Sequence, residues 1–339
     1  MQAVVYDHPR EFSVRELPDP QPGPGEVVLR TAITGVCGTD VHLHQGEFAP
    51  TYPLIPGHEI IGEVAARDDD VDYLEIGQLV AVDNVIACGW CSQCRAERPQ
   101  LCEHALALGV TGPGGFASHV AADARKCHPV DDLSRDVAVM AEPTACAIHG
   151  VDVLRLQPGS DVLVFGAGPT GLVLTQLLVH GGAARVTVAA PTAFKLDLVK
   201  AYGADETVLM RRDDPAAAQA RLRELAPLGF DVVVDATGAL SVLEQCIGLT
   251  RDDGTVFVYG MAGEQDQLAV RPYEIFRREL TIKGSFAQAY GFERALAVLR
   301  SGRVKTDGIV THRFGLGEYG AALDAVQHDQ SCLKAAVLP

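Results

Sequence analysis

Hydrophobic residues follow two different patterns along this chain. Up to about residue 150, short apolar segments are separated by turns, and a loop rich in proline and glycine precedes a predicted strand at 27–32. Beyond residue 160, apolar runs with almost no polar alternation are typical of parallel strands covered on both faces. These runs are residues 162–165, 232–234 and 256–259, and helical patterns lie among them at 172–179 and 194–202. The alternation of strands and helices predicts βαβ units and a doubly wound sheet in an α/β fold.

Length and charge narrow the possibilities. The chain has 339 residues, too many for one ordinary core, which indicates two domains. Its formal net charge is −16 and its basic residues are scattered, so we expect no nucleic-acid partner, because a phosphate backbone would be repelled. No apolar run reaches the roughly 18 residues that span a bilayer, and the first residues lack the pattern of a signal peptide. We therefore expect a cytoplasmic protein that does not bind membranes.

A glycine-rich turn directly follows the first buried run and opens a helical pattern. Its sequence is Gly166-Ala-Gly168-Pro169-Thr170-Gly171. Gly166 would permit a tight turn, Gly168 the close approach of a pyrophosphate, and Gly171 the close packing of helix against strand. We interpret this turn as a dinucleotide-binding motif; a purely structural turn is the alternative.

The acidic residue that usually follows such a turn by about 20 positions is missing. The second strand ends in Ala190, where a carboxylate would bond the ribose 2′-hydroxyl of NAD and repel the 2′-phosphate of NADP. Donors or positive charge for a 2′-phosphate are available at Thr192, Lys195, Arg211 and Arg212. We therefore predict a preference for NADP, with NAD as the alternative cofactor.

Four of the nine cysteines fall within fifteen residues. They are Cys88, Cys91, Cys94 and Cys102. Two-residue gaps let a tight turn aim successive thiolates at one zinc ion, and four thiolates leave no open coordination position. The cluster therefore predicts a structural zinc site; disulfides and idle thiols are the alternatives.

A second set of possible metal ligands is dispersed along the chain. It comprises Cys37, the adjacent pair His58 and Glu59, and Glu142 before a proline. One thiolate, one imidazole and one carboxylate would give three ligands with the fourth position open, as a catalytic zinc requires. The sequence shows the residue types and leaves their convergence open.

Taken together and in order, these motifs resemble the zinc-containing medium-chain dehydrogenases over essentially the whole chain. The matching elements are GVCGTDVH at 35–42, GHE at 57–59, CGWCSQC and a fourth cysteine at 88–102, EP at 142–143, and GAGPTG at 166–171. Within that family, GHE followed by EP and the stretch KGSF at 283–286 are similar to the polyol branch, which includes sorbitol and arabitol dehydrogenases.

The resemblance implies a role for each candidate residue. Cys37, His58 and Glu59 would hold a catalytic zinc, with water or the substrate oxygen as the fourth ligand. Glu142 would touch that water or replace Glu59 as a ligand. The four clustered cysteines would hold the structural zinc on a surface lobe.

The resemblance also implies a proton relay and a domain plan. Thr39 and His42 fall where the family places a relay that runs through the nicotinamide ribose. The implied fold is a GroES-like, partly open β-barrel catalytic domain interrupted by a Rossmann domain. The expected boundaries are 1–150 for the catalytic domain with a zinc lobe at about 86–104, 151–285 for the Rossmann domain, and 286–339 for the return to the catalytic domain.

Two departures from the family pattern bear on specificity. One is Ala190, discussed above. The other concerns an Arg-Tyr pair that animal sorbitol dehydrogenases carry just after the KGxF stretch, where it helps to bind the polyol. Ala287 and Gln288 stand at those positions here, so the particular polyol stays unassigned.

The expected function is hydride transfer between a secondary alcohol of a sugar alcohol and NADP, in an enzyme with two zinc ions per chain. Related enzymes are dimers or tetramers, so we expect a homo-oligomer. The alternative enzyme acts on a simple secondary alcohol, an aminocyclitol or a sugar hydroxyl. Less favoured are a non-catalytic, zinc-stabilised nucleotide sensor, which needs no open metal site, and a nucleic-acid-binding ribbon, which the acidic charge disfavours.

Overall fold

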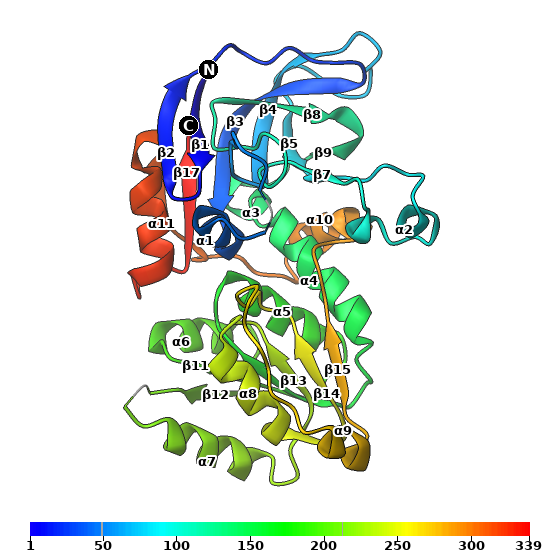
Figure 1. Cartoon of the computed structure of the whole chain (residues 1–339), viewed down its shortest axis with the longest axis vertical. Helices are drawn as coiled ribbons and strands as arrows, with labels where there is room; N and C mark the ends of the chain where they lie inside the picture. Colours follow the sequence, from blue (N-terminus) through cyan, green and yellow to red (C-terminus); the bar gives the residue numbers. More distant parts are fainter. Residues whose placement is uncertain (49, 212) are drawn as a thin grey trace. The chain divides into compact units, whose positions relative to one another are not determined.

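The computed structural model describes residues 1–48, 50–211 and 213–339; Arg212, expected near a 2′-phosphate, lies outside them. The chain forms two compact units. The first consists of Met1–Ala145, Ala289–Gly302 and Thr306–Pro339, and the second of Cys146–Gln288 and Arg303–Lys305. The predicted α/β fold is confirmed (Figure 1).

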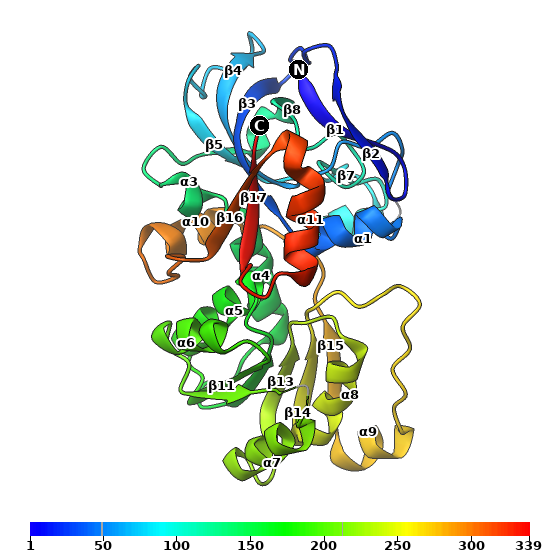
Figure 2. The ribbon, with the colours of Figure 1, turned by 90° about the vertical axis from the view of Figure 1, so that its left-hand side faces the viewer.

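The first unit is built on a sheet that joins distant parts of the sequence. The strand order is β16-β17-β3-β4-β5-β9, with β8 also paired to β3. These strands are β3 (Glu26–Val36), β4 (Glu59–Arg67), β5 (Leu79–Val82), β8 (His119–Asp123), β9 (Cys127–Pro129), β16 (Val310–Gly315) and β17 (Lys334–Leu338). Strand β17 runs antiparallel to β3, with Ala335 opposite Val36. Figure 2 shows α11 (Tyr319–His328) beside β17, which it contacts.

Two apolar cores hold the strand ends of this unit in place. Val27 and Leu29 of β3 belong to one core, and Val36 at the other end of the strand belongs to a second core with Leu43 and Tyr319. The remaining elements are β1 (Gln2–His8), β2 (Glu11–Glu16), α1 (Gly38–Gln45), β6 (Val85–Ile86), α2 (Ser92–Arg95), η1 (Pro99–Leu101), β7 (Leu106–Ala107), η2 (Ala124–Lys126), α3 (Arg135–Ala138), α10 (Phe292–Arg300) and η3 (Leu316–Glu318). The helix α4 (Ala141–Leu154) begins in this unit and continues into the second. The end of β3 is therefore buried where α1 begins.

One helical stretch, Arg135–Leu154, is long and apolar enough to cross a membrane by length and composition alone, although the sequence suggested no such segment. In its apolar window, 67% is buried inside the protein. Burial of most of this window is typical of a core helix.

The second unit contains a six-stranded parallel sheet in the order β12-β11-β10-β13-β14-β15. Its elements are β10 (Asp161–Phe165), α5 (Pro169–His180), β11 (Arg185–Ala190), α6 (Ala193–Ala201), β12 (Glu206–Leu209), α7 (Pro215–Leu225), β13 (Phe230–Asp235), α8 (Leu240–Leu249), β14 (Thr250–Val258), α9 (Pro272–Arg278) and β15 (Thr281–Gly284). The predicted apolar runs lie on β10, β13 and β14 and are largely buried. Strands β10 to β12 are added toward one edge of the sheet and β13 to β15 toward the other. At the switch point between β10 and β13, the carboxyl ends of the parallel strands leave room for a dinucleotide.

Candidate functional site

Cys37 is positioned by the transition from β3 to α1. It is the N-terminal cap of α1, and its backbone N–H donates to Oδ2 of Asp40 at 2.8 Å. Its thiol lies 3.7 Å from the hydroxyl oxygen of Thr39. The helix start thus holds Cys37, Thr39 and Asp40 together, as the sequence GVCGTD leads one to expect.

His58 and Glu59 lie at the start of the neighbouring strand β4, and both are buried. Gly57 has φ +93°, and a Cβ there would come within 2.8 Å of the backbone of Phe116, so the turn into β4 requires glycine. Glu59 pairs with Gly35 across the sheet, and a Cβ on Gly35 would lie only 1.8 Å from Glu59 Oε2. The glycine therefore leaves the space that the carboxylate occupies.

These elements bring three predicted metal ligands together. One ligand atom each from Cys37, His58 and Glu59 lies within 4.8 Å of the others. Among the residues the structure describes, His58 Nδ1 and Glu59 Oε2 are buried without a hydrogen-bond partner, although Oε2 also lies in an ion pair with Lys334. Nδ1 of His58 lies 3.8 Å from Oδ1 of buried Asp40, so the ring can face the carboxylate with one nitrogen and a metal with the other. This donor set fits a zinc ion with an open coordination position.

Acidic groups surround the His58 ring. Burial opposes the charged form of His58, but Asp40, Cys37 and Glu142 together hold the pKa of this imidazole well above its usual value. Burial also raises the pKa of the Asp40 carboxyl. A divalent cation is the natural counter-charge for such a group of side chains.

Lys334 is a member of this site that the sequence analysis missed. It is 3% exposed, and its ammonium donates a hydrogen bond to Glu59 Oε1. Burial would lower the pKa of Lys334, but Glu59, Cys37 and Glu142 raise it overall, so the side chain is charged. A lysine in an unplaced C-terminal tail gave no signal of this pairing, which depends on β17 joining β3.

The other predicted catalytic residues lie on α1 and at the start of α4. Thr39 is beside Cys37, and His42 is one turn further along α1, with Nδ1 2.5 Å from Oε2 of Glu47. Glu142, at the start of α4, acts electrostatically on His58 and Lys334 but is not in the group of converging ligand atoms in the described part of the chain.

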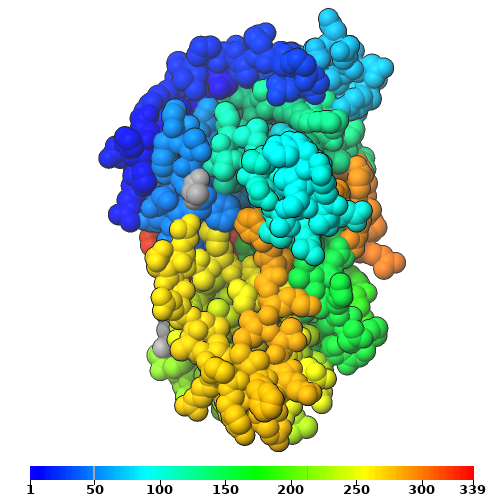
Figure 3. All heavy atoms as spheres, turned by 45° about the vertical axis from the view of Figure 1, so that its right-hand side comes forward, coloured from blue at the N-terminus to red at the C-terminus, as the bar shows by residue number. Residues whose placement is uncertain are grey.

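The cysteine cluster forms a lobe on the surface of the first unit, drawn in cyan in Figure 3. Its four ligand atoms converge, with sulfur–sulfur distances of 3.9 Å for Cys88–Cys94 and 3.8 Å for Cys91–Cys102. Two sulfurs bound tetrahedrally to one zinc at about 2.3 Å lie roughly 3.8 Å apart, whereas a disulfide requires about 2.05 Å. The geometry fits a zinc ion and leaves these thiols unbridged.

Backbone N–H groups in the lobe favour the thiolate form of Cys91. Amide N–H groups of the Cys94 and Glu103 backbones lower the pKa of the Cys91 thiol to about 6. The thiolate, which is the form that binds zinc, is thereby favoured. Trp90 stacks on His104 with ring centroids 4.6 Å apart and stays 59% exposed.

The glycine-rich turn has the geometry of a dinucleotide-binding loop. Gly166 has φ +107°, and a Cβ on Gly171 would lie 2.2 Å from the Gly166 carbonyl oxygen. Gly168 caps α5, with Pro169 and Thr170 in its first turn, and open space surrounds the position of a Cβ on Gly168. The free N–H groups at the start of α5 can therefore be approached closely by a phosphate.

The residues expected near a 2′-phosphate gather around the end of β11. Ala190 ends this strand, Thr192 caps α6, and Lys195 lies in its first turn over the Phe194 ring. The N–H of Met210 donates to the Ala190 carbonyl at 2.9 Å, which brings the segment after β12 alongside. Arg211, the next residue, pairs with Asp213 at 2.8 Å.

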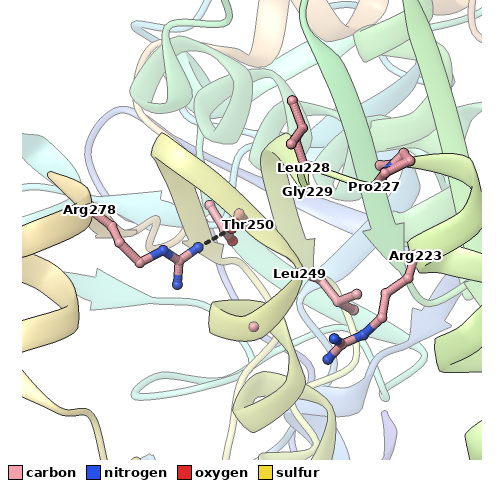
Figure 4. A pocket seen from close by; sticks show the side chains of 9 residues that line it. Arg223, Pro227, Leu228, Gly229, Leu249, Thr250 and Arg278 are labelled. Carbon is pink, nitrogen blue, oxygen red and sulfur yellow. Dashed lines mark hydrogen bonds between the residues drawn. The ribbon is translucent and has the colours of Figure 1, made fainter.

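A pocket lies at the amino ends of the strands of this sheet (Figure 4). It is lined by Arg223, Gly229, Leu249, Thr250, Arg278 and their neighbours, and Arg278 donates to the Thr250 carbonyl. Gly229 and Thr250 stand where β13 and β14 begin. Dinucleotides bind at the carboxyl ends of such strands, so this pocket is not the cofactor site.

Comparison with known proteins shows to which family the chain belongs. The model of the alcohol dehydrogenase GroES-like domain matches residues 23–132, and that of the zinc-binding dehydrogenase domain matches residues 169–301. The chain belongs to the zinc-dependent medium-chain dehydrogenase family. It is a dehydrogenase, and the resemblance derived from its motifs is confirmed.

Relatives of this dehydrogenase include enzymes of sugar alcohols. It is 44% identical to D-arabinitol dehydrogenase 1 of Uromyces fabae over 100% of this chain and 97% of that protein. It is 35% identical to D-altritol 5-dehydrogenase of Agrobacterium fabrum over 94% of both chains. A zinc-binding dehydrogenase from Sinorhizobium meliloti, solved bound to NADP, superposes with a TM-score of 0.91 at 31% identity and covers 100% of this chain and 99% of that chain. These relatives confirm the resemblance to the polyol branch.

Proposed function

We propose that this dehydrogenase oxidises a secondary hydroxyl of a sugar alcohol, with NADP as the preferred hydride acceptor and two zinc ions per chain. The convergence of Cys37, His58 and Glu59 carries the proposal, because a ligand set with an open position suits a catalytic zinc, whereas a structural site is closed. The polyol relatives at 44% and 35% identity support the substrate class.

Each group of residues has a defined task in this reaction. Cys37, His58 and Glu59 would hold the catalytic zinc, and Asp40 would orient the His58 ring from behind. A zinc ion held there would supply Lewis acidity toward the hydroxyl, and a bound nicotinamide would supply the hydride acceptor. Thr39 would take the hydroxyl proton and pass it toward His42, whose ring is oriented by Glu47.

The second unit would bind the dinucleotide. The open face of Gly168 and the N-terminus of α5 would hold the pyrophosphate. The proposed NADP preference rests on Ala190, since no carboxylate at the end of β11 repels a 2′-phosphate, and on Lys195 nearby. The NADP bound to the Sinorhizobium meliloti relative supports the same cofactor.

The second zinc would stabilise the lobe that carries Cys88, Cys91, Cys94 and Cys102. With four thiolate ligands this site offers no position for substrate, so its task is structural. We also propose a homo-oligomer, which mass-resolved size-exclusion chromatography tests.

Initial rates on zinc-replete protein test the proposal. Polyols, simple secondary alcohols, an aminocyclitol and sugars would each be assayed with NADP and with NAD. The proposal predicts turnover of a polyol with a higher kcat/KM for NADP. Activity confined to a simple alcohol or another sugar hydroxyl would replace the substrate class, and a clear preference for NAD would contradict the cofactor assignment.

A further inference from the structure

Lys334 and Glu59 form a buried ion pair inside the proposed zinc site. Lys334 is 3% exposed and Glu59 is 1% exposed. We propose that Lys334 is a positioning residue that shares the Glu59 carboxylate with the catalytic zinc and thereby limits how tightly the metal is bound. The inference rests on the proposed function of Cys37, His58 and Glu59 as zinc ligands.

The two oxygens of the Glu59 carboxylate have different surroundings. The Lys334 ammonium lies against both, but only Oε1 accepts from it with hydrogen-bond geometry. Within the described part of the chain, Oε2 is buried without a hydrogen-bond partner. The ammonium thus contacts both carboxylate oxygens, and a metal held by Glu59 would share the carboxylate with it.

The surrounding backbone keeps the lysine and the carboxylate together. A Cβ on Gly35 would lie 1.8 Å from Glu59 Oε2 and 3.0 Å from Lys334 Cε, so both side chains pack against bare backbone. Lys334 precedes Ala335, which pairs with Val36, and it pairs with Val310 on its other side. With strands on both sides, the lysine has little freedom to leave the carboxylate.

The charges predict the direction of the effect on the metal. A buried ammonium beside the ligand repels a divalent cation and draws electron density from the carboxylate, so zinc is held less tightly and keeps more of its positive charge. Asp40 and Glu142 add negative charge to the same site, which Lys334 partly offsets. Removal of the lysine charge should therefore tighten zinc binding and slow turnover.

A lysine with only a structural role predicts the opposite effect on the metal. Loss of a partner from a buried pair would then disorder Glu59 and weaken zinc binding. The sign of the change in zinc affinity separates the two accounts, which a loss of activity alone would not do.

The experiment measures zinc affinity by competition with a chromogenic chelator, with the zinc of the cysteine lobe as an internal reference. Lys334→Gln keeps a hydrogen-bond donor and removes the charge, and Lys334→Arg keeps the charge. Lys126→Gln is the matched control, because Lys126 pairs with Asp83 at 2.7 Å in the same unit, outside the ligand group. Lys334→Met, which is apolar and of similar length, replaces Lys334→Gln if the latter does not fold.

We expect Lys334→Gln to bind the catalytic zinc at least about tenfold more tightly and to lower kcat with a polyol at least about tenfold. Lys334→Arg and Lys126→Gln should stay near wild type in zinc affinity. Weaker or unchanged zinc binding in Lys334→Gln would overturn the inference while leaving the proposed function intact. Cys37→Ser in the same assay tests the proposed site itself: retention of both zinc ions in that variant would overturn the site and the inference with it.

Discussion

Oδ1 of Asp40 lies 3.8 Å from Nδ1 of His58, and both side chains are buried at the junction of β3, α1 and β4. Asp40 also accepts from the Cys37 backbone N–H through its other oxygen, so one carboxylate supports two of the three proposed zinc ligands. The order of the site thus depends on a residue that is not among the three proposed ligands.

Asp40→Ala should therefore weaken the catalytic zinc without removing any ligand. Loss of a carboxylate behind a metal-bound histidine typically reduces metal affinity about 10- to 100-fold. We expect a loss in this range for the catalytic zinc, with the lobe zinc retained, as measured by chelator competition. Asp40→Asn keeps an acceptor for the Cys37 N–H and should lose less. Wild-type zinc affinity in Asp40→Ala would show that the carboxylate does not support His58.

Gly35→Ala should disrupt the site from β3, the strand that pairs with β4. The new methyl group would overlap Glu59 Oε2 at 1.8 Å, and a buried carboxylate paired with a buried lysine has little room to move. Overpacking of this kind costs about 1–3 kcal/mol of unfolding free energy, and zinc content should fall with it.

Gly38→Ala is the matched control for Gly35→Ala. Gly38 lies three residues away at the start of α1, and nothing stands within 4 Å of the position of its Cβ. Thermal unfolding and metal analysis of both variants check the prediction. Equal thermal stability of the two variants would show that the close fit of Gly35 to Glu59 does not contribute to stability.

Ala190→Asp should shift the cofactor preference toward NAD. A carboxylate at the end of β11 can bond the ribose 2′-hydroxyl and repels a 2′-phosphate. We expect the ratio of kcat/KM for NADP to that for NAD to fall at least about tenfold, since two unit charges about 4 Å apart near a protein surface interact by about 1–4 kcal/mol. Lys195→Ala should lower the same ratio by reducing kcat/KM for NADP while leaving kcat/KM for NAD unchanged. An unchanged ratio in both variants would place the 2′ recognition elsewhere.

Cys94→Ser and Cys37→Ser should each remove one zinc, from different sites. Loss of the lobe zinc should lower the melting temperature, because a structural zinc contributes directly to folding energy. Loss of the catalytic zinc should abolish turnover and leave dinucleotide binding in place. Metal counting together with thermal unfolding checks the pair of variants. Two zinc ions in Cys94→Ser would refute the structural site.

Much of the fold was accessible from sequence because its signals are local. The runs on β10, β13 and β14 are apolar throughout, and the glycines at 166, 168 and 171 follow β10 at the spacing that a close turn and a packed helix require. The two-residue gaps between Cys88, Cys91 and Cys94 predict that these thiols converge with that of Cys102, and the structure places the four sulfurs at distances suited to one metal.

Long-range features were not accessible in the same way. Lys334 reaches Glu59, 275 residues away in sequence, because β17 pairs with β3, and no periodicity in the tail encodes that pairing. The charge that Arg211 offers to a cofactor is offset by Asp213, an interaction that a list of basic residues does not reveal. Residue types predicted the ligands, whereas the charged neighbours of those residues could be identified only from the packing of distant segments.

The most direct test of the account compares wild type and Cys37→Ser, both loaded with zinc, in the NADP-dependent oxidation of D-arabinitol and other sugar alcohols, with NADP affinity measured in parallel. The account predicts turnover of at least one polyol by wild type, none by Cys37→Ser, and equal NADP binding by both. Oxidation of a polyol by Cys37→Ser at the wild-type rate, or no oxidation of any polyol by zinc-loaded wild type, would contradict it.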